Sequence, residues 1–391
     1  MATLVCPYCY DSFAEKRILF RCSGLIGPAG KKCPLTRDTV LFDRFGIQDA
    51  LPTTFAGNGR HRNAVHELCG ARTHHRVCPF CHSRLPVDFG KIDNRLIAMI
   101  GAKESGKTVY MTVLLHELMH GVGRRFDASM NGCDDHTLNQ FTQRFEHGLY
   151  EQSALPATTK SAGAEQMQPL VYRVSLPRRG LLGERERHTI TSFFDTAGED
   201  LTSRASVDLN TRYLGSADGV ILLLDPLQMR GARDRAGPDT PMPGTGAGFD
   251  SPFNVLTRVT DLLRETGGLG PGKKIKTPIA VAFSKMDALW DSFEPDSPLL
   301  QEASAARPAL DLSDTEAVHE HVRALLEEWD GGQIDQLLRA NYAAYSFFGL
   351  SALGAVPRNG KVAGDGIRPH RVEDPYLWLL NRFDVIANHR S

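Results

Sequence analysis

The sequence has no long apolar run and almost no excess of charge of one sign. Its longest strongly apolar run covers residues 219–224, whereas a membrane-spanning helix needs about 20 apolar residues. The formal net charge is −1, so no overall field attracts the chain to nucleic acid or to an anionic membrane. The first ten residues contain neither the basic nor the apolar region of a secretory signal. We therefore expect a cytoplasmic protein without a membrane partner.

Cysteine is scarce outside one part of the chain. Seven of the eight cysteines lie before residue 82, several of them in close pairs, which in a reducing compartment indicates metal binding rather than disulfides. Composition therefore divides the chain into a Cys- and Arg-rich module at 1–90 and a larger domain at 91–391. Within the larger domain, residues 227–252 are rich in Gly and Pro, and we expect a mobile insert there that does not pack.

The larger domain alternates short apolar runs with segments of helical periodicity. The runs predicted to be strands lie at residues 96–100, 170–174, 189–194, 220–224, 279–283 and 344–349. Asp134 or Asp135 could cap one helix, and Ser313 with Glu316 predicts a capping box at the start of another. This alternation predicts an α/β fold with a mostly parallel sheet covered by helices.

The first predicted strand leads into a complete phosphate-binding motif. Residues 101–108 read GAKESGKT, a match to GxxxxGK[ST], and a helix is predicted directly after it, as the motif requires. Its glycines let backbone N–H groups surround phosphates, Lys107 can reach the outer phosphates, and the Thr108 hydroxyl can hold Mg²⁺. The candidate nucleotide-binding residues here are Gly101, Lys103, Glu104, Ser105, Gly106, Lys107 and Thr108. The motif predicts a P-loop NTPase.

A second motif follows the predicted strand at 189–194. Residues 193–200 read FFDTAGED and contain DxxG. In this motif Asp195 can reach Mg²⁺ through water, and the N–H of Gly198 can sense the γ-phosphate. The motif therefore adds a metal ligand and a phosphate sensor to the predicted site.

Two further motifs favour guanine as the base. Residues 284–287 read SKMD, a variant of NKxD. Asp287 could accept the two N–H groups of guanine that adenine lacks, while the stem of Lys285 packs on the base. After the last predicted strand, Ser351 and Ala352 begin a turn that could close over the guanine.

The ordered set GAKESGKT, DTAGED, SKMD and SAL resembles the translation-factor-related class of Ras-like P-loop GTPases, over roughly residues 92–391. This resemblance implies a Mg²⁺-dependent GTP switch with two nucleotide-sensing loops. With its cysteine-rich module, the chain also resembles the bacterial double-GTPase family proposed to act in conflict or signalling systems. Ser284 is a departure, because the class usually has asparagine there. The serine is expected to weaken a link to the P-loop and to affect affinity more than base choice.

Two further roles follow from the resemblance. Thr158 or Thr159 could contact Mg²⁺ and the γ-phosphate, and we choose Thr159. Glu199 stands where Ras-like proteins carry the glutamine that orients water, and a carboxylate cannot donate a hydrogen bond to the phosphoryl oxygens. We therefore expect slow GTP hydrolysis with Lys107, Thr159 and Glu199 as catalytic residues. A partner protein, which could be an activator, an effector or a second GTPase, would accelerate it.

Eight potential ligands in module 1–90 suit two tetrahedral zinc sites. They are Cys6, Cys9, Cys22, Cys33, His66, Cys69, Cys78 and Cys81. Sequence order predicts that the first four share one zinc and the last four another, although a cross-braced pairing is possible and His74 or His75 could replace His66. The module has 12 Lys and Arg against 7 Asp and Glu, but zinc thiolates offset most of this excess. We therefore favour protein docking over nucleic-acid binding.

A second enzyme signature competes with the P-loop. Residues 116–120 read HELMH, the HExxH motif of zinc metalloproteases. However, it lies on the helix predicted after the P-loop, and Phe126 stands where the extended motif has a third histidine. We interpret it as accidental. A third class, a nucleotide-binding scaffold without turnover, would bind GTP but release no phosphate.

Overall fold

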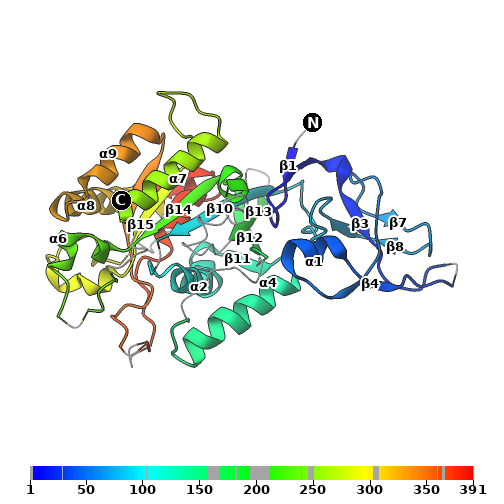
Figure 1. The fold of residues 1–391 in the computed structure, drawn as a ribbon, viewed down its shortest axis with the longest axis horizontal. Coiled ribbons are helices and arrows are strands. Elements are labelled where there is room, and N and C mark those ends of the chain that lie inside the picture. The colour runs from blue at the N-terminus through cyan, green and yellow to red at the C-terminus, as the bar shows by residue number, and fades with distance from the viewer. Residues whose placement is uncertain are drawn as a thin grey trace.

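The computed structural model describes most of the chain. The described residues are 3–28, 30–102, 104–156, 168–180, 183–193, 211–238, 240–244, 251–302, 308–358, 360–362 and 366–390. Figure 1 shows a large central sheet flanked by helices, with a group of small N-terminal elements, which we call the head, beside it. No helix in these ranges is both long and apolar enough to cross a membrane.

Seven strands of the described chain form the central sheet, in the order β11-β12-β13-β10-β14-β15-β17. Their bounds are β10 Asp93–Gly101, β11 Ser129–Gly132, β12 Leu170–Gly180, β13 Gly183–Phe193, β14 Gly219–Leu224, β15 Ile279–Phe283 and β17 Tyr345–Gly349. Neighbours from β13 to β17 are parallel, whereas β12 pairs antiparallel with β13, and β11 with β12. All six predicted strands are present, and the mostly parallel α/β sheet is confirmed.

Helices cover both faces of this sheet because alternate side chains of each inner strand point to opposite sides. Val220 belongs to the core shared with α7, α8 and α9, and its neighbour Ile221 belongs to the core shared with α2 and α10. The bounds are α2 Lys107–Glu117, α7 Pro252–Thr266, α8 Leu312–Glu328, α9 Gly332–Asn341 and α10 Asp374–Arg382. Since β14 and β15 are buried throughout, they read as continuous apolar runs.

Shorter helices complete this part of the chain. The helix after the P-loop continues as π-helix η2 (Leu118–Val122) and then α3 (Gly123–Phe126). Asp134 caps α4 (Asp135–Gln140) by accepting a hydrogen bond from the Thr137 N–H, and α4 runs on into π-helix η3 (Phe141–Glu151). Two short strands, β16 (Leu310–Asp311) and β18 (Asn388–His389), pair near the C-terminus. Asp134 and not Asp135 is therefore the cap of α4, so the first of the two predicted alternatives is confirmed.

The described part of the head consists of short strands, one α-helix and one short 3-10 helix. Its elements are β1 Thr3–Val5, β2 Ser12–Ala14, η1 Glu15–Arg17, β3 Leu19–Arg21, β4 Leu35–Arg37, α1 Thr39–Phe45, β5 Ala50–Pro52, β6 Thr54–Phe55, β7 Ala64–Val65, β8 Arg72–Thr73 and β9 His75–Val77. Strand β3 is central, pairing antiparallel with β6 and with β9. In Figure 1 the head lies beside the end of the sheet that carries β11, β12 and β13. This arrangement places the part of the head that carries Cys6 and Cys9 next to the larger part of the chain.

The expectation that insert 227–252 does not pack is wrong for its first part. η4 (Pro226–Gln228) and α6 (Arg230–Arg233) are helical. Leu227 and Ala232 are buried in the core shared with α7 and α8. These apolar side chains, scattered among glycines and charges, bury the segment despite its composition.

The start of α8 also differs from the prediction. The predicted capping box would make Ser313 the N-cap. Instead the helix starts at Leu312, and the carboxylate of Asp311 accepts the N–H of Ser313 at 2.9 Å. The cap precedes Ser313 because Asp311 is also the last residue of β16, so the strand and the helix meet there.

Candidate nucleotide site and metal centres

The P-loop joins β10 to α2 with a geometry suited to phosphate. Gly106 has φ 77°, a left-handed conformation, and immediately precedes α2. A Cβ at Gly101 would collide with Ser105 Oγ. This Ser105 hydroxyl is buried and has no hydrogen-bond partner among the described residues. Lys107 and Thr108 open α2, whose first-turn N–H groups lack intrahelical acceptors and attract anions.

Ser284 links the SKMD motif directly to the P-loop. Its hydroxyl donates to the carbonyl of Ser105 at 2.7 Å and lies 3.2 Å from the carbonyl of Leu224. Ser284 is buried, directly after β15. The serine was expected to weaken the link to the P-loop because it replaces the usual asparagine. The link is nevertheless present, and the Ser284 hydroxyl makes it in place of an amide.

Asp287 meets the turn that follows β17. Ser351 Oγ donates to Asp287 Oδ1 at 2.6 Å and accepts the N–H of Gly354 at 2.8 Å. Burial raises the pKa of Asp287, and the hydrogen bond from Ser351 opposes that rise. Ala352, next in the chain, is half-buried. The two motifs predicted to bind guanine are thus in contact, with an acceptor held at their junction.

Asp225 is a site residue that the sequence reasoning missed. It is fully buried directly after β14, and its Oδ2 lies 2.6 Å from Lys285 Nζ. It also accepts the N–H of Leu227 at 2.9 Å. Lys285 has φ 56°, so its conformation and its amine are both fixed. Its position directly after the apolar run 219–224 is the feature of the sequence that could have identified it as a site residue.

Several predicted nucleotide residues lie outside the described residues. They are Lys103, Thr158, Thr159, Asp195, Gly198 and Glu199. The structure describes the chain up to Phe193 and again from Thr211. Residues on both sides of the DxxG motif therefore belong to the described chain.

Tyr213, which follows the DxxG motif, hydrogen-bonds to the backbone of β10 where β13 no longer pairs with it. Its hydroxyl accepts the N–H of Met99 at 2.9 Å and donates to the carbonyl of Ile97 at 3.0 Å. β13 pairs with β10 only as far as Leu96, so the next backbone groups of β10 need another partner. Tyr213 supplies it. No sequence motif marked this residue.

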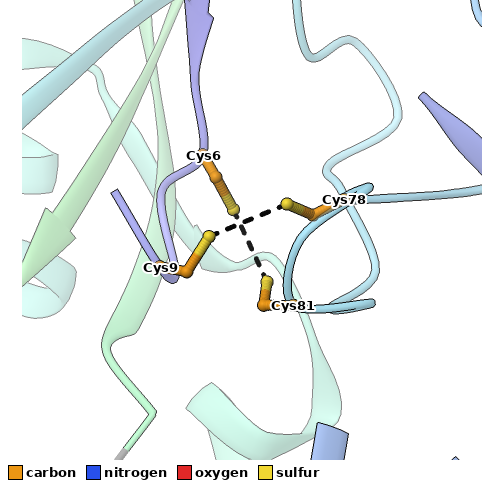
Figure 2. Close-up of side chains that lie close together, drawn as sticks. All are labelled: Cys6, Cys9, Cys78 and Cys81. Atoms are coloured by element: carbon orange, nitrogen blue, oxygen red, sulfur yellow. Dashed lines mark hydrogen bonds between the residues drawn. The ribbon is translucent and has the colours of Figure 1, made fainter. Parts of the chain in front are cut away.

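Two groups of four side chains in the head could each hold a metal ion. Figure 2 shows the first, which we call the outer site, formed by Cys6, Cys9, Cys78 and Cys81. Its sulfurs lie 3.8 Å apart between Cys6 and Cys81, and 3.7 Å apart between Cys9 and Cys78. Four sulfurs at the about 2.3 Å zinc–sulfur distance on a tetrahedron lie about 3.8 Å from one another. The donor set and spacing fit zinc.

The second group, which we call the inner site, has three sulfurs and one imidazole. Its members are Cys22, Cys33, His66 and Cys69, all buried. His66 Nδ1 lies 3.1 Å from Cys33 Sγ and 3.4 Å from Cys69 Sγ, which identifies the nitrogen that faces the site. His66, not His74 or His75, completes the group.

The pairing expected from sequence order is wrong. Antiparallel strands β3 and β9 place Leu19 opposite Val77 and Arg21 opposite His75. Cys78 therefore leaves the ladder at one end and Cys22 at the other. Each site forms at its own end of this ladder. The first and last cysteine pairs of the sequence share the outer site, and all four ligands of the inner site lie between those pairs in the sequence.

The outer site packs on the central sheet. The carbonyl of Pro7 accepts the Ser192 hydroxyl at 2.6 Å, and the carbonyl of Tyr10 accepts the Ser216 hydroxyl at 3.2 Å. The ring of Tyr10 lies 4.9 Å from the ring of Tyr213. Ser192 precedes the DxxG motif, whereas Tyr213 and Ser216 follow it. The turn between Cys6 and Tyr10 thus contacts both flanks of that motif.

The sheet order and the linked P-loop, SKMD and SAL motifs define a Ras-like P-loop GTPase with an N-terminal module that could bind zinc. A family model described as Double-GTPase 2 matches residues 95–324, more than half of the chain, and the chain belongs to this family. It is also similar to SaeC of Mycolicibacterium smegmatis, whose name gives it a proposed role in ESX-1 scaffolding and assembly. The identity is 27% over 328 residues, covering 79% of this chain and 80% of SaeC.

Solved structures of other GTPases are similar at low TM-scores. Sup35 complexed with GDP has 15% identity and a TM-score of 0.26, with 67% of this chain and 38% of that chain covered. The bacterial selenocysteine-specific elongation factor EF-Sec has 13% identity and a TM-score of 0.26, with 74% and 29% covered. The Saccharomyces cerevisiae Ski7 GTPase-like domain, bound to GDP and inorganic phosphate, has 13% identity and a TM-score of 0.30, with 75% and 51% covered. The chain spans about half or less of each of these structures.

Proposed function

We propose that this chain binds GTP with Mg²⁺, hydrolyses it slowly, and acts as a switch controlled by a partner protein. The observation that carries this proposal is the hydrogen-bonded junction of the motifs. Ser284 links SKMD to the P-loop carbonyl of Ser105, and Ser351 links the SAL turn to Asp287. A chance Gly-rich turn would not be joined in this way to a guanine-type motif. Membership of the Double-GTPase 2 family supports the same function.

The P-loop residues would hold the phosphates and the metal. Lys107 and the N–H groups at the start of α2 would neutralise the outer phosphates. Thr108 and Thr159 would bind Mg²⁺ through their hydroxyls, and Asp195 through water. Mg²⁺ would neutralise charge on the β- and γ-phosphates, while the N–H of Gly198 would report the presence of the γ-phosphate.

Asp287 would select the base. Its carboxylate would accept N1–H and the exocyclic amine of guanine, and the hydrogen bond from Ser351 favours the ionised form that does so. The stem of Lys285 would cover the ring, since Asp225 holds its amine in place. The N–H of Ala352 would contact the base from the far side, and Ser351 would support it by holding the turn, since its own N–H donates to the carbonyl of His370 at 3.0 Å.

Replacing Asp287 with asparagine should shift the preference from GTP to xanthosine triphosphate. An amide can donate a hydrogen bond to the C2 oxygen of xanthine, whereas it repels the amine of guanine by presenting donors to a donor. We expect wild-type protein to bind GTP in preference to ATP, and the variant to lose GTP affinity by about 10–100-fold, which corresponds to the loss of one charged hydrogen bond. Competition binding with the three nucleotides measures both effects.

Asp291→Asn is the matched control. It removes the same charge four residues away, on an exposed side chain, and should leave the nucleotide preference unchanged. Equal competition by ATP and GTP for the wild-type site would contradict the base assignment.

Glu199 should keep intrinsic GTP hydrolysis slow. A carboxylate can accept a hydrogen bond from the attacking water, but its charge opposes that of the phosphoryl oxygens and it cannot donate to them. We expect Glu199→Gln to hydrolyse GTP faster than wild type in single turnovers, and Glu199→Ala to be slower. If the alanine variant matches wild type with and without candidate partners, Glu199 has no catalytic role.

A partner would then supply the missing positive charge, and an arginine in that place is worth about 10³–10⁵ in rate. A second GTPase is one such candidate partner. We infer that the chain works in the cytoplasm as part of a bacterial conflict, signalling or assembly system, with two Zn²⁺ ions in a head that docks a protein. The name of SaeC favours a second candidate function, a nucleotide-binding scaffold without turnover. In that case this chain would bind GTP and release no phosphate.

A further inference from the structure

The two histidines of the HExxH motif have a third potential ligand beside them. His116 belongs to α2, His120 to η2 and Glu146 to η3. One ligand atom from each lies within 4.8 Å of the other two. The motif lacked a third histidine because position 126 is a phenylalanine, but a carboxylate from a different helix takes that place in space.

We propose that His116, His120 and Glu146 bind a divalent transition metal ion, with zinc as the best match. Two imidazole nitrogens and one carboxylate oxygen form a set that zinc accepts in proteins. Three protein ligands leave one position of a tetrahedron for water. The carboxylate of Glu146 gives the cluster an acidic group, which favours a cation as its ligand.

Packing orients the rings before any metal binds. The His116 ring stacks on Tyr150, with centroids 4.0 Å apart and an interplanar angle of 21°. The rings of His116 and His120 lie 4.4 Å apart, and His116 Nδ1 lies 3.0 Å from Glu146 Oε1. The Tyr150 hydroxyl is buried and has no hydrogen-bond partner among the described residues. This unused donor belongs to the residue whose ring stacks on His116.

The backbone of both ligand-bearing segments is unusual. His120 lies in π-helix η2 and Glu146 in π-helix η3. π-Helical turns are rare and occur frequently at functional sites. The motif's own glutamate, Glu117, extends along the helix instead, since a Cβ at Gly121 would lie 2.7 Å from its Oε2. Glu117 supplies no ligand to the cluster, and metal binding is the role that the geometry of His116, His120 and Glu146 supports.

The proposed metal would join the helix that follows the P-loop to η3. A simple ion pair between His116 and Glu146 would make a similar contact, but it needs neither His120 nor a metal. The role of His120 therefore separates the two explanations.

Calorimetric titration of the full chain, already loaded with zinc at its cysteine sites, tests the proposal. We expect one further Zn²⁺ to bind, and metal counting after desalting to show one more equivalent than the cysteine sites retain. His120→Ala and Glu146→Gln should each lower the affinity of this event by more than the about 10–100-fold that loss of a second-shell partner costs. Neither variant removes a fully buried side chain, so both should fold.

His147→Ala is the matched control. His147 is an exposed histidine next to Glu146 that pairs with Glu151 and lies outside the cluster. It should bind the additional ion as wild type does. Absence of the additional equivalent, or equal binding by His120→Ala and Glu146→Gln, would leave only the ion pair and overturn the proposal.

Discussion

Replacing Cys81 with serine should weaken GTP binding as well as open the outer metal site. In small zinc domains the metal contributes about 10–16 kcal/mol to folding, so loss of a ligand should melt the turn from Cys6 to Tyr10. That turn is part of the GTPase core. Tyr10 is 2% exposed and packs on Tyr213, which in turn holds the backbone of β10 just before the P-loop. Damage to the head should therefore reach the nucleotide site.

Loss of a buried aromatic contact costs about 3–5 kcal/mol. We therefore expect the midpoint of thermal unfolding to fall by roughly 10 °C. The GTP affinity of the folded Cys81→Ser protein should fall with it. Differential scanning fluorimetry and nucleotide titration measure the two quantities on the same preparation.

Cys33→Ser gives the matched control at the inner site. The apolar cluster around Cys22, Cys33 and Cys69 contains only head residues, whereas the outer cluster includes Val171 and Ile190 of the central sheet. The inner variant should lose its metal and leave GTP affinity unchanged. If both variants affect GTP binding equally, the outer site has no privileged connection to the GTPase core.

Replacing Lys107 with alanine should abolish detectable GTP binding at micromolar protein. The side chain lies at the first position of α2 and is only 7% exposed. Hydrogen bonds from a charged donor contribute about 1.5–3 kcal/mol each, so losing two phosphate contacts weakens binding by roughly 100-fold or more. Equilibrium binding of a fluorescent GTP analogue measures the change.

Lys276→Ala serves as the control for Lys107, since it removes an exposed lysine just before β15. Its GTP affinity should equal that of wild type. Glu117→Ala should also bind GTP normally, because Glu117 belongs to the HExxH sequence and not to the P-loop. Retention of GTP by Lys107→Ala would show that the P-loop is not the phosphate site.

The parts of the fold that were predictable are those in which burial determines the residue pattern. β14 and β15 are covered on both faces, so their sequences are apolar without interruption. The edge strand β11, by contrast, reads Ser-Met-Asn-Gly and is only partly buried, so it carries no pattern that distinguishes it from a loop. Strands β12 and β13 extend beyond the predicted runs, because the sequence near Gly180 and Gly183 is polar and shows no apolar pattern.

The candidate site divides in the same way. The residues of GAKESGKT are neighbours in the sequence, so the P-loop could be predicted from the sequence alone. Ser284, which hydrogen-bonds to that loop, was instead expected to weaken the link. Asp225 and Tyr213 act through partners far along the chain, Lys285 and the backbone of β10 respectively. Metal pairing is also non-local, since the register of β3 against β9 decides it. Sequence distance gives no information about that register.

The nesting of the two candidate metal sites imposes an order on folding during synthesis. During synthesis the inner site can close once Cys69 has emerged, whereas the outer site must wait for Cys81, although its first ligand is Cys6. The turn that begins at Cys6 also lacks its hydrogen-bond partners on the larger domain until Ser192 and Ser216 have been synthesised. Domains generally fold from the N-terminus as the chain grows. Here the turn from Cys6 to Tyr10 is synthesised early but can reach its final packing only late. A chain shortened at its N-terminus would lose a piece of the GTPase core and not a removable tail.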